Sequence, residues 1–172
     1  VMLLDGGVQA WQETGYELFS GVSVPSKAFG EIVENINETP NITSEELHSK
    51  RAAGEDVIVL DARPRDEYLN MTIPGSINVP GAELIYRVRT IVSNPTTQIV
   101  VNCAGRTRSI IGAQSLINAG VPNPIKALRN GTMGWHLAGY ELEKGATRLA
   151  PEPNSLTIAQ AQVMAANVAK RF

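Results

Sequence analysis

The sequence predicts an α/β protein built on a central, mainly parallel β-sheet flanked by helices. Two short apolar runs, Val57–Leu60 and Gln98–Asn102, have the length and composition of strands that are buried on both faces. Segments with helical spacing of apolar residues lie between and after these runs. Strands that alternate with helices indicate a parallel sheet, because a parallel connection needs a crossover and the crossover is usually a helix.

The other elements follow in chain order. A helix is expected at 29–36, where apolar residues recur at helical spacing. A second helix should begin at Thr43 or Ser44, either of which can cap it, and should end at Gly54. The remaining expected elements are a helical turn at 65–69, a strand within 73–80, helices at 84–92 and 109–119, a strand at 124–128, and helices at 133–138 and 156–172.

A long internal repeat indicates how the chain is divided. A shift of 124 residues superimposes Leu4–Leu18 on Leu128–Leu142 and makes Trp11 and Trp135 coincide. This period suits a whole domain rather than a solenoid unit. We therefore expect the tail of a preceding repeat at 1–20, a linker at 21–40, a complete domain at 41–147, and a second linker with a C-terminal helix at 148–172. A single domain with two similar helical hairpins is the alternative.

Composition and charge narrow the function classes. The net charge of −2 argues against nucleic acid or an anionic membrane surface as a partner, and no apolar run of about 18 residues predicts a membrane span. One cysteine excludes an internal disulfide and a cysteine-based zinc cluster, and the two histidines, His48 and His136, have no metal-ligand spacing. We expect no metal and no cofactor. A lone reactive thiol favours a reducing cytoplasm.

The single cysteine, Cys103, lies directly after a predicted strand and before a predicted helix. In a parallel sheet this is the edge where ligands bind, and the helix N-terminus with its loop N–H groups favours an anion. Arg106 and Arg108 add positive charge, so the sequence favours a reactive thiolate. The alternative is a buried structural cysteine, against which the two arginines count.

Two kinds of chemistry use a cysteine in an anion-binding loop. Cysteine phosphatases have the spacing C-x5-R, but here Cys103 and Arg108 are spaced C-x4-R and the next position holds Ser109. A loop that is shorter by one residue suits a single sulfur atom, carried as a persulfide, better than a tetrahedral phosphate. A phosphatase or an arsenate reductase is therefore the weaker alternative.

Several motifs in order resemble the rhodanese (thiosulfate sulfurtransferase) family across roughly residues 41–144. These motifs are V-L-D-A-R followed by D-E-Y in 59–68, I-P-G-S-I-N-V-P in 73–80, the cysteine loop, and R-N-G through W and G-Y in 129–140. The resemblance implies a three-layer rhodanese-like fold whose active-site loop has six residues and begins with cysteine. Two positions depart from the family pattern: Thr72 replaces a histidine, and Asn130 replaces a glycine.

The resemblance also implies a function, in which a sulfane sulfur is carried on Cys103 between thiosulfate, or a similar donor, and an acceptor. Substrate-binding positions would be those of the loop, with Arg108 the stronger side-chain candidate: Ala104, Gly105, Arg106, Thr107, Arg108 and Ser109. Asp61 and Arg63 are expected to form a structural ion pair near the site, and Trp135 to pack beneath it. His136, on the same predicted helix as Trp135, is expected at the surface.

The expected partners are a small anionic sulfur donor, a thiol or cyanide acceptor or a protein sulfur acceptor, and neighbouring rhodanese repeats. The competing class is a non-catalytic or relay module that carries sulfur or docks a protein partner. Fold alone does not separate this class from an enzyme. The intact cysteine loop favours the enzyme.

Overall fold

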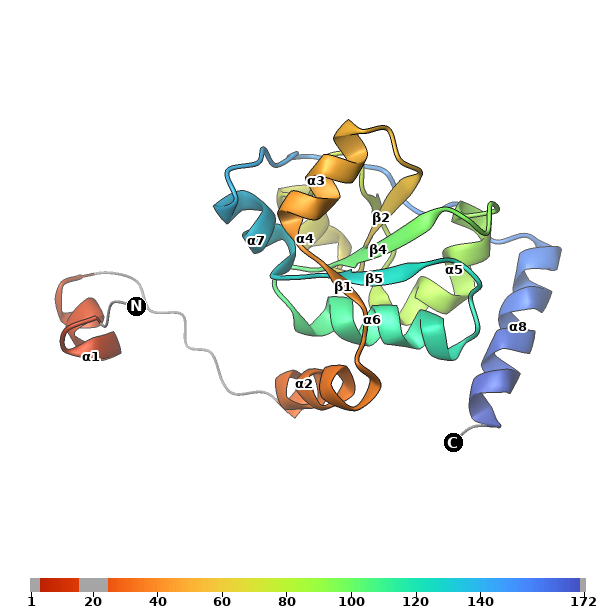
Figure 1. Cartoon of the computed structure of the whole chain (residues 1–172), viewed down its shortest axis with the longest axis horizontal. Coiled ribbons are helices and arrows are strands. Elements are labelled where there is room, and N and C mark those ends of the chain that lie inside the picture. Colours follow the sequence, from red (N-terminus) through yellow and green to blue (C-terminus); the bar gives the residue numbers. More distant parts are fainter. Residues whose placement is uncertain (1–3, 16–24, 171–172) are drawn as a thin grey trace.

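A five-stranded, wholly parallel sheet forms the centre of the computed structural model, which describes residues 4–15 and 25–170 (Figure 1). The strand order is β1-β5-β4-β2-β3, so the central position belongs to the strand that precedes Cys103. The mainly parallel sheet predicted from the sequence is confirmed. The strands are β1 (Asn41–Ile42), β2 (Val57–Asp61), β3 (Ile77–Asn78), β4 (Gln98–Asn102) and β5 (Ile125–Leu128).

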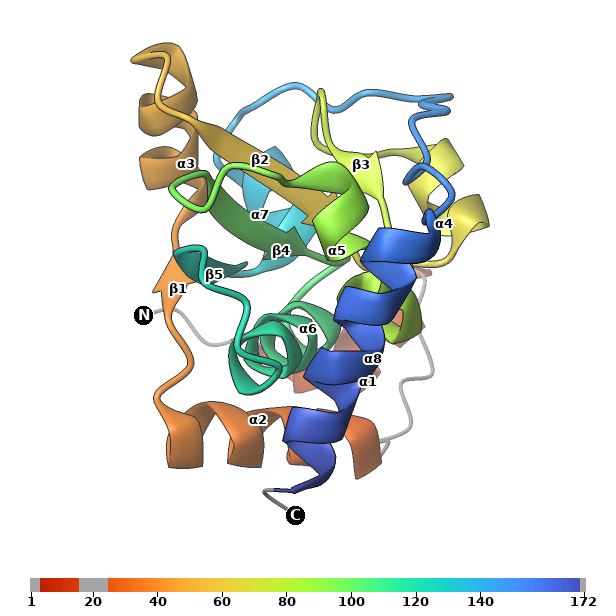
Figure 2. The same ribbon diagram turned by 90° about the vertical axis from the view of Figure 1, so that its right-hand side faces the viewer.

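Helices cover both faces of the sheet and make the three layers that the resemblance implied (Figures 1 and 2). On one face, Val59 and Val100 share a buried cluster with Leu47 and Trp135, which come from two helices. On the other face, Leu60 and its neighbours pack against two further helices. The first pair is α3 (Ser44–Ala52) and α7 (Gly131–Leu137), and the second is α5 (Leu84–Ile91) and α6 (Thr107–Asn118).

The remaining helices lie outside these layers. The helix α2 (Pro25–Asn37) packs on α6, and α8 (Ser155–Ala169) packs on α5 (Figure 2). The others are α1 (Gly7–Glu13), α4 (Arg65–Asn70) and the 3-10 turn η1 (Gly81–Glu83). Among the described helices, none has both the length and the apolar character needed to cross a membrane.

The observed helix ends can be compared with those predicted from the local sequence. The predicted cap is confirmed at Thr43, whose hydroxyl accepts the Glu46 N–H at 3.2 Å while the Thr43 N–H donates to the Glu46 carboxylate at 2.9 Å. Helix α6 begins at Thr107, two residues before its predicted start, because the Arg106 carbonyl accepts the Ile110 N–H. Asn154, which the prediction missed, caps α8 by accepting the Thr157 N–H at 3.0 Å.

The segment before β1 contains a longer helix than expected. A helix was predicted at 29–36, and α2 runs over 13 residues, Pro25–Asn37. Its buried residue is Gly30, which lies against Thr107 of α6, so this part of the expected linker is packed on the sheet-bearing domain. Residues 1–3, 16–24 and 171–172 lie outside the described residues, and the domain boundaries proposed near them stay predictions.

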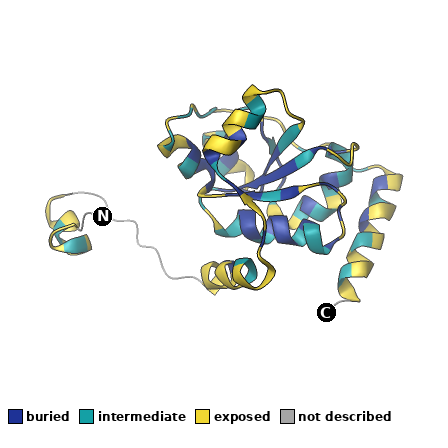
Figure 3. Cartoon of the chain, viewed as in Figure 1, coloured by how far each residue is buried: buried dark blue, intermediate teal, exposed yellow. Residues whose placement is uncertain are grey.

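Burial is concentrated in the sheet and in the helix faces that touch it (Figure 3). Strands β2 and β4 are buried along most of their length, as expected for strands covered on both faces. The carboxyl ends of these two neighbouring strands carry Asp61 and Asn102, which are paired in the parallel register. This register places polar side chains, and then Cys103, at one edge of an otherwise apolar sheet.

Candidate active site

Cys103 follows β4 directly and lies in the loop that leads into α6, as the sequence predicted. Its side chain is almost fully buried, with 2% exposed. The thiol donates to the Ser109 hydroxyl at 3.6 Å, and that hydroxyl donates to the Arg106 carbonyl at 2.7 Å. The loop therefore curls over the first turn of α6 and brings the side chains of Cys103 and Ser109 together.

The loop presents a row of free donors. Within the described part of the chain, the backbone N–H groups from Ala104 to Ser109 donate to no protein acceptor, and the first helical bond of α6 is made by the Ile110 N–H. Three of these groups are the unsatisfied N–H groups that every helix start leaves, and the helix dipole adds positive potential there. Such a row can hold a small anion or a charged sulfur beside the thiol.

Helix α7 fixes the outer side of this loop. The Thr132 N–H donates to the Cys103 carbonyl at 2.8 Å, and the Met133 N–H donates to the Ala104 carbonyl at 3.0 Å. Gly131 has a φ of 52°, and a Cβ there would overlap the Cys103 carbonyl oxygen and lie 2.8 Å from the Gly105 oxygen. Only glycine combines that conformation with so close an approach. The sequence motif around Gly131 was noted, but this role in holding the loop was missed.

A buried polar network lies beneath the loop. Asp61 and Arg63 form the expected ion pair, with side chains 0% and 3% exposed and an Oδ2 to Nη2 distance of 2.7 Å. The same carboxylate oxygen accepts from the Thr72 hydroxyl at 2.8 Å and from Asn102 Nδ2 at 2.9 Å. Asn102 Nδ2 also donates to the Thr132 hydroxyl at 2.9 Å. The network therefore joins β2, β4 and α7 immediately before Cys103.

Thr72 shows what the departure from the family motif does here. Its side chain is fully buried, and besides its bond to Asp61 its hydroxyl shares a 2.8 Å hydrogen bond with Ser76. A buried polar group is stable only when its hydrogen bonds are made, and Thr72 makes them. Threonine thus replaces the histidine of the resemblance as a structural donor in the network.

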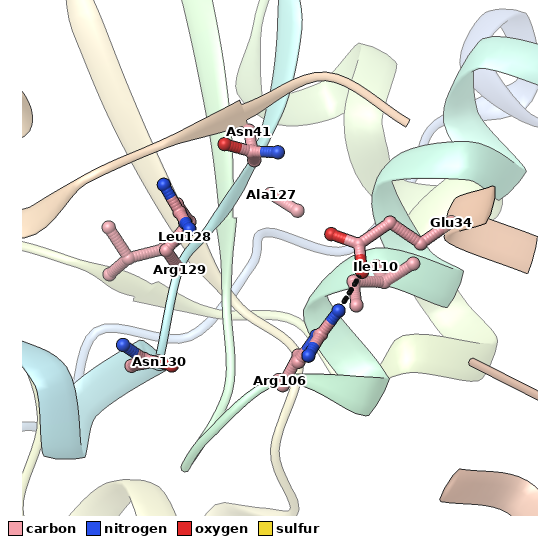
Figure 4. A pocket seen from close by; sticks show the side chains of 8 residues that line it. All are labelled: Glu34, Asn41, Arg106, Ile110, Ala127, Leu128, Arg129 and Asn130. Atoms are coloured by element: carbon pink, nitrogen blue, oxygen red, sulfur yellow. Dashed lines mark hydrogen bonds and ion pairs between the residues drawn. The ribbon is translucent and has the colours of Figure 1, made fainter. Parts of the chain in front are cut away.

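Both loop arginines are held by carboxylates that the sequence prediction missed. Arg108 makes a two-pronged pair with Glu67 of α4, at 2.7 and 2.8 Å, and Arg106 pairs with Glu34 of α2 (Figure 4). The hydrogen bonds from Arg108 lower the pKa of Glu67, and the pairing with Glu67 raises the pKa of Arg108. The pKa of Arg106 is likewise raised chiefly by its hydrogen bond with Glu34.

The aromatic residues near the site serve packing. Trp135 is 4% exposed, lies in the cluster beneath the sheet and donates its Nε1–H to the Glu141 carbonyl at 2.9 Å. Tyr140 lies against Trp135 and stacks on His48 at a ring-centroid distance of 4.2 Å. The packing role predicted for Trp135 is confirmed, and His136 is exposed as expected. Among the described residues, no group of three or more potential metal ligands is found.

Comparison with known proteins places this geometry in a family. A family model described as a rhodanese-like domain matches residues 43–138. The crystal structure of a thiosulfate sulfurtransferase from Pseudomonas aeruginosa is 54% identical, with a TM-score of 0.86 over 99% of this chain and 33% of that chain. This chain therefore spans about one third of the length of that relative.

Two curated relatives are more distant. The HTH-type transcriptional regulator Rv0324 of Mycobacterium tuberculosis is 36% identical over 105 residues, which cover 61% of this chain and 45% of that protein. YrkF, a proposed sulfur carrier protein of Bacillus subtilis, is 27% identical over 141 residues, which cover 73% of this chain and 72% of that protein. The family match spans more than half of the 172 residues and includes the cysteine loop and its supporting network. The chain belongs to the rhodanese-like domain family.

Proposed function

We propose that this chain is a sulfurtransferase domain in which Cys103 carries the transferred sulfur. The observation that carries the proposal is the row of free backbone N–H groups from Ala104 to Ser109, in the loop and first turn of α6 that directly follow the single cysteine. Donors fixed before the reaction stabilise charge that develops in it, at no cost of reorganisation. The similarity to a thiosulfate sulfurtransferase at 54% identity supports the same chemistry.

The first half-reaction uses thiosulfate or a related sulfane donor. The Cys103 thiolate attacks the outer sulfur, a bond forms between Sγ and that sulfur, and the sulfur–sulfur bond of thiosulfate breaks. The bonding electron pair leaves with sulfite. The loop N–H groups then hold the negative terminal sulfur of the Cys103 persulfide, and the Asp61 network keeps the loop base rigid.

The second half-reaction returns the thiolate. An acceptor thiolate or cyanide attacks the terminal sulfur, a new bond forms to that sulfur, and the bond to Sγ breaks with its electron pair returning to Cys103. This two-step exchange needs no metal or organic cofactor. A cleft of about 430 Å³ lies beside Arg108 and is lined mainly by apolar groups of Ala62, Pro64, Pro80 and Ile111, so an organic acceptor has a surface to approach.

Intact mass spectrometry tests the proposal. Incubation with thiosulfate should add the mass of one sulfur atom, the gain should be lost on adding a dithiol reductant, and Cys103→Ser should show no gain. Cys103 is the only cysteine in the chain, so an adduct on thiol is assigned without digestion. A Cys103→Ser variant that still transfers sulfur would exclude this mechanism.

A relay module is the second candidate, and one observation favours it. YrkF, a proposed sulfur carrier, is 27% identical to this chain over 141 residues, which cover 73% of this chain. In this case, a persulfidated protein rather than a free anion would load Cys103. Loading by a protein persulfide without loading by thiosulfate would identify the relay.

The segment 4–18 recurs 124 residues later, at 128–142, and this repeat supports a proposal about the domain organisation. We propose that residues 1–20 are the end of a preceding rhodanese repeat, that 41–147 form the complete rhodanese domain, and that neighbouring repeats are its partners. A lone reactive thiol is best kept reduced in the cytoplasm, which is the compartment we propose.

A further inference from the structure

The charge of the loop is cancelled by two flanking helices. Of the two arginines in the loop, Arg108 is paired with Glu67 from α4 and Arg106 with Glu34 from α2. The partners are 41 and 72 residues away in sequence, so neither pairing follows from helix spacing within one element. Each loop cation is therefore offset by one carboxylate, and the backbone N–H groups from Ala104 to Ser109 have no acceptor among the described residues.

Helix α2 packs closely on the start of α6 and directs Glu34 toward Arg106. A Cβ on Gly30 would come within 2.8 Å of the Thr107 side chain, so α2 lies directly on the first turn of α6. Glu34 follows Gly30 by four residues and therefore lies on the same helix face, one turn further along. Its side chain is 19% exposed, against 53% for its partner Arg106, so the carboxylate is held and the guanidinium reaches out to it.

Figure 4 shows how this pair is placed beside the loop. Arg106 and Glu34 form their ion pair on one side of a polar pocket of about 110 Å³. Arg129 and Asn130 line the opposite side of this pocket. Within the described residues, the Arg129 side chain makes no hydrogen bond or ion pair. If Glu34 were uncharged, the pocket would keep two guanidinium groups and lose the only carboxylate among its lining residues.

We propose that Glu34 and Glu67 are specificity-determining residues that mask the loop arginines and so weaken binding of dianionic sulfur donors relative to monoanionic ones. This inference rests on the proposed function, since it concerns donors of the Cys103 loop. Its physical basis is Coulombic: a freed guanidinium attracts a dianion twice as strongly as a monoanion at the same distance. A residue that served only structure would change the binding of both donors alike.

The test measures binding in a chain that cannot turn over. In the Cys103→Ser background, titration calorimetry gives the Kd of thiosulfate, a dianion, and of methanethiosulfonate, a monoanion with the same sulfane sulfur. We expect Glu34→Gln and Glu67→Gln each to lower the thiosulfate Kd by about two- to fivefold at low ionic strength, with a smaller change for methanethiosulfonate. The gain should shrink as salt is raised, because exposed charges are screened.

Matched controls separate masking from the loss of one negative charge. Glu31 lies on the exposed side of α2 and acts on Arg106 through charge alone, and Asp66 is the exposed neighbour of Glu67 in α4. Glu31→Gln and Asp66→Asn should change the thiosulfate Kd by less than their neighbours do. Equal changes in test and control variants, equal changes for both donors, or no measurable thiosulfate binding in the unmasked variants would overturn the inference.

The outcome is separable from the proposed function. Sulfur loading of the chain with Cys103 intact, read by intact mass, decides whether the protein is a sulfurtransferase. The Kd values in the Cys103→Ser background decide whether the two carboxylates set donor preference. A protein that loads sulfur but shows no selective gain in the variants keeps its function and refutes the masking.

Discussion

Helices α1 and α7 are two copies of one repeated segment with one backbone conformation and two different surroundings. Each has seven residues, Gly7–Glu13 and Gly131–Leu137. Each follows a left-handed residue, Gly6 with a φ of 70° and Asn130 with a φ of 57°. The first glycine of each helix also has a positive φ, 62° in α1 and 52° in α7.

The two copies differ in what surrounds them. Trp135 in α7 is 4% exposed and belongs to a core cluster, whereas the equivalent Trp11 in α1 is 41% exposed. A side chain on Gly131 would overlap the Cys103 carbonyl, whereas one on Gly7 would meet nothing within 4 Å. None of the residues of α1 is buried. Similar local sequences therefore give the same turn and helix, and of the two copies α7 is the one whose N–H groups bind the carbonyls of the Cys103 loop.

The largest expected effect is on the two tryptophans. Trp135→Ala should lower the free energy of unfolding by about 3–5 kcal/mol, because a large buried side chain is lost and a cavity remains. Trp11→Ala should cost about 1 kcal/mol or less, as for a largely exposed site. Urea unfolding followed by circular dichroism measures both, and Trp135→Phe should recover part of the loss. Equal costs at the two positions would refute the contrast.

The glycine pair tests the loop contact itself. Gly131→Ala should destabilise the domain by about 2–4 kcal/mol, since backbone strain at positive φ adds to overlap with the loop carbonyls. It should also slow persulfide formation on Cys103, because the loop must move. Gly7→Ala should leave the domain's unfolding midpoint and its sulfur loading unchanged. Unaltered loading in a folded Gly131→Ala protein would show that α7 does not position the loop.

The third prediction exchanges a residue between the copies. Thr132 in α7 corresponds to Val8 in α1, so Thr132→Val places the α1 residue in the α7 setting. Asn102 Nδ2 then loses one acceptor in a buried network, which should cost about 1–3 kcal/mol. The reverse exchange, Val8→Thr at a 66% exposed position, should change stability by less than about 0.5 kcal/mol. Thermal unfolding of the two variants provides the comparison.

The smallest expected effect on stability concerns the ion pair between Glu67 and Arg108, the arginine in the first turn of α6. The pKa of Glu67 is lowered from 4.5 by its hydrogen bonds with Arg108. A carboxyl with a lowered folded pKa stabilises the fold above its unfolded pKa and loses that contribution as pH falls through the folded value. Glu67→Gln should therefore be destabilising at pH 7 and equal to wild type in strong acid.

The size of this effect is limited by exposure. Both side chains of the pair are 42% exposed, so the difference at pH 7 should not exceed about 1 kcal/mol. Urea unfolding from pH 7 down to pH 3 measures it. Arg108→Gln should reproduce the trend, and the double variant should be no less stable than the worse single one. A difference that persists in acid would assign the effect to packing rather than charge.

Much of the fold was predictable because its signals are local. The apolar runs of β2 and β4, the Thr43 cap and the placement of Cys103 between strand and helix are read from neighbouring residues. The expected ion pair between Asp61 and Arg63 joins residues that are two positions apart, so this contact is local too. The predicted start of α6 was two residues too late. Thr107 and Arg108 belong to the six-residue cysteine motif, but in the structure they already have helical conformation.

The candidate site was less predictable wherever distant elements meet. The sequence indicated which loop carries the thiol but not that Glu34 and Glu67 occupy its arginines. It also did not indicate that the N–H groups of Thr132 and Met133 tie down the Cys103 and Ala104 carbonyls. These contacts join residues that lie between 29 and 72 positions apart. No short pattern encodes them, because many carboxylates and N–H groups could serve equally.

The sequence by itself determined the local conformations: the left-handed turn before each repeated helix, the buried strands, and a cysteine poised at a helix start. Tertiary structure decided which carboxylates pair with the loop arginines, and within residues 1–172 only the Trp135 copy of the repeat has a sheet to pack against. The physical reason is the sequence separation over which each kind of interaction acts. Turn and helix preferences depend on residues within a few positions, whereas burial and ion pairing depend on surfaces that exist only once the sheet has assembled.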